Sequence, residues 1–146
     1  GKIRAGSTSD ELVCLTDVLA TCADLVRAKL PADAAEDSES ILPVLLREEL
    51  EWPLHEAVVH HSGGGMFAIR QGDWKLIDGL GSGGFSAPRT EKPKPGGPKG
   101  QLYNLAKDPV EKENLYAKEP AVVKRLSALL AKYREQGHSA RRLARR

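Results

Sequence analysis

The fold is decided within residues 57–77, which read AVVHHSGGGMFAIRQGDWKLI. Gly63-Gly64-Gly65 and Gly72-Asp73 interrupt this stretch, and glycine reaches positive φ angles without steric cost, as tight turns require. The remainder consists of three short runs rich in β-branched and aromatic residues, at 57–60, 66–70 and 74–77. Runs of this kind separated by glycine turns predict three consecutive antiparallel strands.

The residues that follow this stretch extend the predicted sheet. Residues 79–100 contain about half of the glycine and proline of the chain and few apolar residues, which is typical of a long loop. This loop is expected either to be mobile or to be ordered by a neighbour. Leu102 and Tyr103 then predict a fourth strand, and Asp108-Pro109 predicts a turn.

A long helix is predicted at residues 120–136. Pro120 lies in its first turn and Gly137 follows its end, which are usual helix boundaries. One face of this helix is apolar and is formed by Val122, Val123, Leu126, Leu129, Leu130 and Tyr133. The helix is expected to pack across the sheet, so the predicted fold is α+β, with a small four-stranded antiparallel sheet and a long C-terminal helix.

The first fifty residues have a different, helical character. Apolar residues between Leu12 and Val26 recur at three- and four-residue steps, which by itself predicts an amphipathic helix. Residues 33–40 are small and acidic and predict a loop. Residues 41–50 carry leucines on one side and predict a short helix.

Charge and hydropathy limit the partners of the chain. The formal net charge is only +2, and the basic tail at residues 138–146 includes Arg141, Arg142, Arg145 and Arg146. The tail lacks the stacking aromatics of a nucleic-acid surface, so we expect a solvated terminus and no nucleic-acid partner. Contact with phosphates or sulfated glycans through charge alone is the alternative. No apolar run has membrane-spanning length, and no membrane partner is expected.

The two cysteines are expected to be buried free thiols, since Cys14 and Cys22 both have apolar neighbours in the sequence. On one continuous helix their Cα atoms would lie roughly 12 Å apart, which is too far for a disulfide.

Three motifs point to a family. Residues 102–115 read LYNLAKDPVEKENL, residues 68–77 read AIRQGDWKLI, and residues 9–21 read SDELVCLTDVLAT. In their sequence, and in their order and spacing along the chain, these motifs resemble the C-terminal part of type I, formylglycine-dependent sulfatases of the arylsulfatase and N-acetylhexosamine-6-sulfatase group. The proline often found before the threonine of the last motif is replaced here by Ala20.

The resemblance implies a domain organisation. Residues 1–50 would be an edge segment of the alkaline-phosphatase-like sulfatase domain, with a buried extended piece at 11–15 and a helix from Asp17, as N-cap, to about Lys29. Residues 51–137 would be the C-terminal sulfatase subdomain. The upstream catalytic domain of the same protein would be the main partner, and apolar surface left exposed in its absence would favour self-association. The resemblance also implies a periplasmic or secreted parent enzyme.

No catalytic residue is expected in this chain. Type I sulfatases use a formylglycine made from the Cys or Ser of a Cys/Ser-x-Pro-x-Arg motif, and neither Cys14 nor Cys22 begins such a motif. The resemblance places that nucleophile and the calcium ligands upstream of Gly1. We therefore expect no cofactor or metal here, calcium and formylglycine in the parent enzyme, and no activity of the chain alone.

His60 and His61 are candidate substrate-binding residues. They end a predicted strand at a glycine turn, and an imidazole can donate a hydrogen bond to a sulfate or sugar oxygen. Adjacent strand residues point to opposite faces, so only one of them can face a given ligand, and His61 is favoured because it is nearer the loop. The alternative is one packed and one solvated histidine.

Arg89 is the third candidate, next to the loop Gly81-Ser82-Gly83-Gly84-Phe85-Ser86. Backbone amides of such a loop can bind an anion, and a guanidinium forks onto paired sulfate or carboxylate oxygens. A similar loop occurs in part of the sulfatase family, which implies a pocket-lining insertion. A plain flexible loop is the alternative.

Other signature residues are interpreted as structural. Arg70, Trp74 and Lys75 belong to the sheet, and Trp74 is expected to cover the small core. Turn backbones are expected to be satisfied by the side chains of Tyr103, Asn104, Asp108 and Asn114.

Two functions therefore compete. In the first, the chain lines the substrate cleft of a sulfatase that acts on sulfated sugars, and the face of the 17–29 helix is left bare. In the second, it is a free-standing anion- or glycan-binding module, which should show no exposed apolar patch.

Overall fold

The computed structural model describes residues 1–31 and 33–141. The described chain forms two compact units. The first contains residues 1–58 and the described residues after 135, and the second contains residues 59–135. The last five residues of the basic tail, with Arg142, Arg145 and Arg146, lie outside the described residues.

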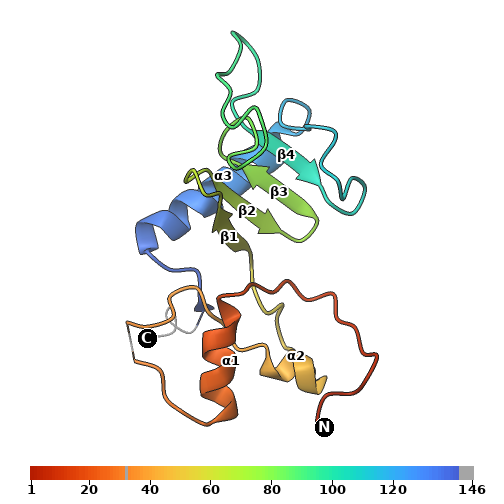
Figure 1. Cartoon of the computed structure of the whole chain (residues 1–146), viewed down its shortest axis with the longest axis vertical. Helices are drawn as coiled ribbons and strands as arrows, with labels where there is room; N and C mark the ends of the chain where they lie inside the picture. The colour runs from red at the N-terminus through yellow and green to blue at the C-terminus, as the bar shows by residue number, and fades with distance from the viewer. Residues whose placement is uncertain (32, 142–146) are drawn as a thin grey trace. The chain divides into compact units, whose positions relative to one another are not determined.

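The second unit is built on a four-stranded sheet with the order β1-β2-β3-β4 (Figure 1). Its strands are β1 (Val58–His61), β2 (Phe67–Gln71), β3 (Trp74–Ile77) and β4 (Gln101–Asn104). The β2–β3 and β3–β4 pairs are antiparallel. The meander predicted from the glycine turns is confirmed. Strands β1 and β2 begin and end one residue later than predicted, and β3 has the predicted bounds.

The turn between β2 and β3 explains the register of the sheet. Gln71 pairs with Trp74, which leaves the two-residue loop Gly72-Asp73, and Gly72 has φ +54°. Two-residue hairpin loops need positive φ, which glycine supplies without strain. The resulting register places Ile69, Leu76 and Leu102 side by side, and they are 0%, 2% and 0% exposed.

Helix α3 (Pro120–Gln136) runs along one face of this sheet, with the bounds predicted (Figure 1). Its apolar stripe of Leu126, Leu130 and Tyr133 is buried. The guanidinium of Arg134 lies 4.7 Å from the centre of the Phe67 ring on β2. The core of this unit is thus a single layer between the helix and the sheet.

The segment between β4 and α3 is held by side-chain hydrogen bonds to backbone groups. Asn104 accepts the N–H of Lys107, and Asp108 accepts the N–H of Glu113. The Asn114 amide accepts the N–H of Leu102 and donates to the carbonyl of Gly100. The predicted turn chemistry is confirmed for these residues, whereas the Tyr103 hydroxyl donates to the Gln101 side chain instead.

The first unit contains two helices that precede the sheet, and both are shorter than predicted. Helix α1 spans Asp17–Leu25 and helix α2 spans Leu42–Leu46. Arg27 just after α1 and Arg47 at the end of α2 have φ of +55° and +61°. A left-handed residue cannot continue a right-handed helix, so the backbone ends both helices earlier than the apolar pattern indicates.

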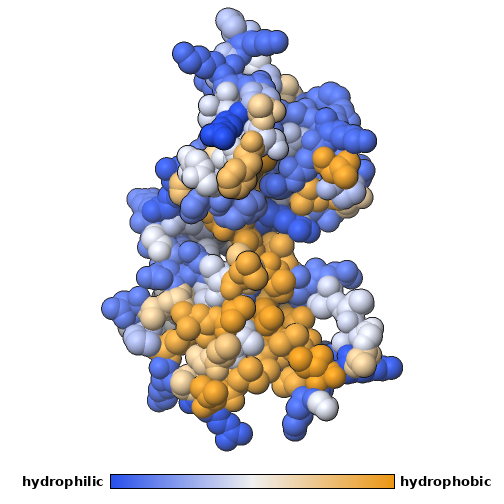
Figure 2. Space-filling model, in the orientation of Figure 1, coloured by the Kyte–Doolittle hydropathy of each residue, from blue (hydrophilic) through white to orange (hydrophobic). Residues whose placement is uncertain are grey.

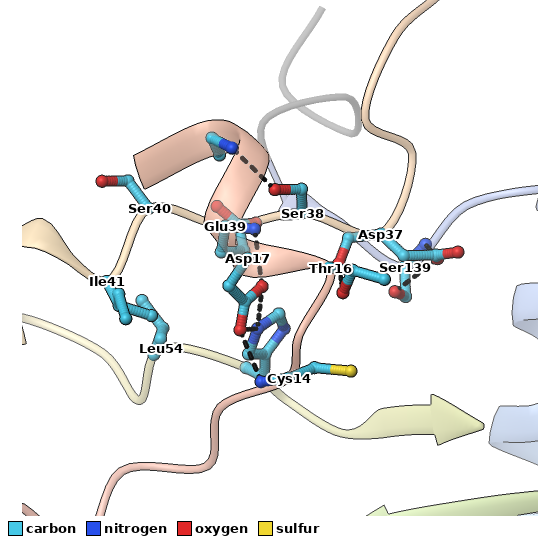
Figure 3. Close-up of polar contacts among 12 residues, drawn as sticks. Cys14, Thr16, Asp17, Asp37, Ser38, Glu39, Ser40, Ile41, Leu54 and Ser139 are labelled. Atoms are coloured by element: carbon cyan, nitrogen blue, oxygen red, sulfur yellow. Dashed lines mark hydrogen bonds and ion pairs between the residues drawn. The ribbon is translucent and has the colours of Figure 1, made fainter. Parts of the chain in front are cut away.

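The N-cap role expected for Asp17 is wrong, because Thr16 is the N-cap and makes no side-chain capping hydrogen bond. Asp17 is instead fully buried, and its carboxylate accepts the backbone N–H groups of Cys14 and Glu39 at 2.7 and 3.0 Å. Nε2 of His55 lies 2.9 and 3.0 Å from the two carboxylate oxygens. One side chain thereby joins three segments around α1 (Figure 3).

Ala20 stands where the family often has proline. Unlike proline, it has a backbone N–H, and this N–H has a hydrogen-bond partner. This buried N–H donates to the hydroxyl of Ser38 at 2.9 Å (Figure 3). Ser38 is only 2% exposed, so the substitution is accommodated by a specific hydrogen bond.

Three further expectations of burial are wrong. Cys22 is exposed and Cys14 is half-buried, because the side of α1 that carries Cys22 faces solvent. The 11–15 segment forms no strand, and Leu15 is 90% exposed. Trp74 is only half-buried, since it lies at the end of the sheet beside the hairpin turn.

The beginning of the basic tail is bound to the first unit rather than free in solvent. The N–H groups of Ser139 and Ala140 donate to the carbonyl of Glu36, and the N–H of Arg141 donates to the Glu39 carboxylate. The Ser139 hydroxyl donates to Asp37 at 2.7 Å.

Candidate functional site

Two glycine-rich segments meet in the second unit. The first is the turn at residues 62–66 after β1, which is closed by a hydrogen bond from the N–H of Ser62 to the carbonyl of Met66. The second is the loop at residues 79–91 after β3. The N–H of Gly64 donates to the carbonyl of Gly83 at 3.2 Å, so the turn and the loop are joined directly.

Within the predicted loop at 79–100, residues 79–91 are connected by hydrogen bonds to one another and to β4. Its two limbs are bridged by hydrogen bonds from Ser82 N to Pro88 O, from Gly83 N to Arg89 O and from Glu91 N to Leu80 O. The Gln101 side chain on β4 donates to the carbonyls of Gly79 and Gly81, which fixes the base of the loop.

Glycine is required where the two segments touch. A Cβ added to Gly83, which has φ +65°, would lie 2.7 Å from the hydroxyl oxygen of Ser62. A Cβ on Gly81, at φ +93°, would lie 2.8 Å from the carbonyl oxygen of Arg89. These positions combine a left-handed backbone with a close approach, so no other residue fits without displacement.

The junction forms a cavity of about 350 Å³ that is open to solvent. Its lining residues are Gly63, Gly64 and Met66 from the turn and Gly83, Gly84, Phe85, Arg89 and Thr90 from the loop. Ligand pockets range from about 300 to 1,000 Å³, so the volume suits one small ligand unit.

Arg89 is the cationic residue of this lining. Its side chain is exposed, and within residues 1–31 and 33–141 its guanidinium has no hydrogen bond or ion pair. Such a group keeps its donors available for paired oxygens of a sulfate or carboxylate. The structure therefore brings Arg89 together with the glycine loop, as the sequence indicated.

Three of the six N–H groups in the loop at 81–86, which were expected to be available to an anion, donate to other groups of the loop. The N–H groups of Ser82 and Gly83 are used by the returning limb, and that of Gly84 donates to the Ser82 hydroxyl. A hydrogen bond within the loop leaves these donors unavailable to a ligand. The charge of an anion in this cavity would thus be met by Arg89.

His60 and His61 are exposed at the end of β1 and neither lines this cavity. His61 lies on the α3 side of the sheet, where its ring centre is 5.7 Å from that of Phe67 and its Nδ1 is 2.8 Å from the carbonyl oxygen of Ser62. His60, as its neighbour on the strand, points to the opposite face. The predicted divergence of the two side chains agrees with these contacts.

The environment of His60 suppresses its charged form. Although His60 is exposed at its surface, neighbouring atoms partly desolvate its imidazole, and this desolvation and then repulsion by Lys75 lower the pKa of His60 below its usual value of 6.5, with His61 adding to this and Glu111 opposing it. Lys75 itself is paired with Glu111 at 2.6 Å. A neutral His60 offers one donor and one acceptor to a ligand instead of a charge.

The described residues supply neither a metal site nor a nucleophile of the sulfatase type. Among residues 1–31 and 33–141, no three His, Cys, Asp or Glu side chains are grouped so that they could hold a metal ion. Cys14 and Cys22 are free thiols outside any Cys-x-Pro-x-Arg sequence. The residues present therefore do not fit calcium or formylglycine. None of the described helices is sufficiently long and apolar to cross a membrane.

The first unit has a separate feature, a bare apolar face on α1. Figure 2 shows apolar residues gathered over α1 and α2. Val18, Leu19 and Leu25 are 53%, 52% and 60% exposed. A groove of about 570 Å³ runs along this face and is lined by Leu15, Val18, Leu19 and Cys22 together with residues 35–38. The exposed helix face expected for a sulfatase segment is thus observed.

Sequence reasoning did not single out three of the cavity residues, namely Met66, Phe85 and Thr90. Phe85 is the one with a signal that could have been read, because an aromatic residue inside a glycine-rich loop has little chance of packing into a core. Met66 and Thr90 are identified only by the way the loop folds over the turn.

Comparisons with known proteins give consistent results, although no protein-family model matches the sequence. An N-acetylgalactosamine-6-O-sulfatase of Bacteroides thetaiotaomicron is 36% identical over 118 residues, which cover 78% of this chain and 22% of that protein. A structure from a study of the metabolism of multiple glycosaminoglycans by B. thetaiotaomicron superposes with a TM-score of 0.63 and 31% identity, over 80% of this chain and 24% of that one.

A further solved structure contains its substrate D-glucosamine-2-N,6-O-disulfate. It superposes with a TM-score of 0.66 and 25% identity, over 92% of this chain and 26% of that one. The chain therefore spans only about a quarter of the length of the relatives it matches, 22% to 26%. The likeness confirms the predicted α+β arrangement of sheet and C-terminal helix.

Proposed function

Because this chain is a sulfatase homologue, we propose that it forms one wall of the substrate cleft in a longer sulfatase that hydrolyses sulfate esters of sulfated sugars. The observation that carries this proposal is the cavity where two glycine-rich segments meet around Arg89. Arg89 binds an anionic group of the substrate there. The sulfated amino sugars named for the similar proteins indicate the substrate class.

The contribution of this chain to the reaction is positioning. It holds the substrate against groups supplied by the rest of the protein, and correct placement of a bound substrate lowers the barrier without any bond chemistry by the binding residue. Formylglycine and calcium belong to the rest of the protein in this proposal, because the residues described here do not fit them. One of His60 and His61 adds a hydrogen bond to the substrate.

The rest of the sulfatase domain is the proposed partner of the first unit. It packs on the bare face of α1, where Val18, Leu19 and Leu25 are exposed and a groove follows the helix. Burying apolar surface contributes about 25 cal/mol per Å², so packing another surface against this face is strongly favourable. The same face disfavours a free-standing binding module, which should have no apolar patch of this kind.

The proposal is tested by kinetics of the longer protein on glucosamine 6-sulfate. Hydrogen bonds to a charged group contribute about 1.5 to 3 kcal/mol, so Arg89→Ala should lower kcat/KM by roughly ten- to hundredfold. The kcat/KM of Arg89→Lys should lie between those of the wild type and Arg89→Ala, since lysine keeps the charge but lacks the forked donors of arginine. Lys92→Ala, an exposed cation three residues away and outside the cavity lining, is the matched control. Wild-type kinetics in Arg89→Ala would contradict the assignment of the cavity.

The histidines are tested in the same assay. Since their side chains leave opposite faces of β1, one of the variants His60→Ala and His61→Ala should lose activity and the other should match the wild type. Wild-type kinetics in both variants would leave Arg89 as the sole substrate contact assigned to this chain.

A further inference from the structure

Phe85 is an outlier in this molecule. Its side chain is 99% exposed, whereas phenylalanine is among the residues most often buried. The exposure does not come from a loose segment, because the hydrogen bonds between the limbs at Ser82, Gly83 and Glu91 fix the loop on either side of it. The backbone therefore holds an uncovered aromatic ring at a defined place.

That place is the rim of the Arg89 cavity, which Phe85 lines together with glycine residues of both segments. The walls contributed by Gly63, Gly64 and Gly84 have no side chains, so a ligand meets peptide groups there. The cavity thus combines three chemistries, namely an aromatic face, a guanidinium and bare peptide groups.

A ligand that uses all three needs an apolar ring face, an anionic substituent and hydroxyl groups. A simple anion would use Arg89 but gain nothing from Phe85. A purely apolar ligand would leave the guanidinium unpaired. A sulfated pyranose has all three features, since its axial C–H groups form an apolar face, its sulfate matches the guanidinium fork and its hydroxyls can bond peptide groups.

We propose that Phe85 is a stacking platform for the pyranose ring of a sulfated sugar whose sulfate is held by Arg89. This inference rests on the proposed function. It adds a contact between Phe85 and the sugar ring, and Phe85 takes no part in sulfate ester hydrolysis itself. The aromatic face selects the sugar and the guanidinium selects the sulfate. The affinity of the site is then expected to depend on both residues.

The test is equilibrium binding of glucose 6-sulfate to the 146-residue chain, measured by titration calorimetry, with glucose and inorganic sulfate as partial ligands. Aromatic stacking contributes enough that Phe85→Ala should weaken glucose 6-sulfate binding by about three- to tenfold, without changing the weaker binding of inorganic sulfate. Phe85→Trp should keep the affinity, and Phe85→Leu should behave as Phe85→Ala, because leucine is apolar but has no ring face.

Val110→Ala is the matched control, since Val110 is 66% exposed and lies outside the cavity lining. It should bind as the wild type does. Equal affinity of wild type and Phe85→Ala would overturn the inference, as would full affinity in Phe85→Leu, which would show that the sugar needs no aromatic ring at this position. Absence of any binding of glucose 6-sulfate to the chain would also overturn it. Binding needs no turnover, so the result does not depend on whether the longer protein hydrolyses sulfate esters.

Discussion

Replacing Asp17 with alanine should be among the most damaging single changes in the first unit. Asp17 is fully buried, and its carboxylate is the shared acceptor for His55 and for the backbone N–H groups of Cys14 and Glu39. Asp17→Ala removes this acceptor and leaves all three donors without it. The segments that carry Cys14, Glu39 and His55 then lose their common attachment to α1.

The magnitude follows from burial. Asp17→Ala leaves three donors without this acceptor, and each buried donor left unsatisfied costs about 1 to 3 kcal/mol. These costs are not additive, because the freed backbone groups can move toward water. We therefore expect a loss of at least about 3 kcal/mol, a large share of the roughly 5 to 15 kcal/mol that stabilises a domain.

The assay is urea denaturation of the 146-residue chain followed by circular dichroism, with thermal unfolding alongside. A loss of about 3 kcal/mol should lower the melting temperature by about 10 °C. Asp24→Ala is the matched control, because Asp24 lies on the same helix, is exposed, and its carboxylate accepts the Ser40 hydroxyl. It should change stability by less than about 0.5 kcal/mol.

A double-mutant cycle with His55→Ala isolates the contact between the two side chains. Residues in direct contact show coupling energies of about 0.5 to 3 kcal/mol, and this pair should lie in the upper half of that range. If Asp17→Ala unfolds at the same urea concentration as Asp24→Ala, or if the coupling to His55 is zero within error, the Asp17 carboxylate does not hold these segments together.

Three further predictions concern the second unit. Leu102→Ala should cost about 2 to 5 kcal/mol, and Trp74→Ala should cost less because the indole is half-exposed; a urea series that ranks them in the opposite order would contradict the core described here. Gly83→Ala should abolish glucose 6-sulfate binding in calorimetry, since its Cβ would lie 2.7 Å from the Ser62 hydroxyl oxygen, and wild-type affinity in this variant would contradict the junction described here. His60 has a lowered pKa, so the unfolded chain binds more protons near pH 6.5 and the contribution of His60 to stability is present above that pH and lost as the pH falls toward the folded value. When the pH is lowered from about 7.5 to about 5, the melting temperature of His60→Gln should therefore fall less than that of the wild type. Equal decreases would show that the pKa of His60 is the same in the folded and the unfolded chain.

The sheet and α3 were predictable because local signals agree there. Glycine turns at 63–65 and 72, strand-forming residues between them, and a helix bounded by Pro120 and Gly137 all favour the same arrangement. The likeness to sulfatases is consistent with that arrangement. Local chemistry and tertiary packing select the same bounds, so little is left for long-range contacts to alter.

The first unit was harder to predict, because its local signals conflict with its contacts. Asp17 is of a residue type that is common at N-caps, yet a contact with His55, 38 residues away, turns its carboxylate inward. Cys22 looks like a core residue in an apolar pattern, yet nothing among the described residues covers that side of α1. Periodicity identifies an apolar face but does not say what lies against it.

The candidate site was predictable in part. Arg89 and the glycine loop were identified from composition, but the use of the loop amides by the returning limb depends on how the loop folds. Phe85 and Met66 join the site only because the loop is joined to the turn after β1. Contacts between two loops have no periodic signature in a sequence, so they emerge only from the structure.

This chain is proposed to position a sulfated sugar for chemistry carried out elsewhere in a longer sulfatase. Sulfate release from glucosamine 6-sulfate should be measured side by side for the 146-residue chain and for the longer protein that contains it. We expect calcium-dependent release by the longer protein and none above background by the chain alone, with or without calcium. Turnover by the purified chain alone, or no turnover by the longer protein, would contradict it.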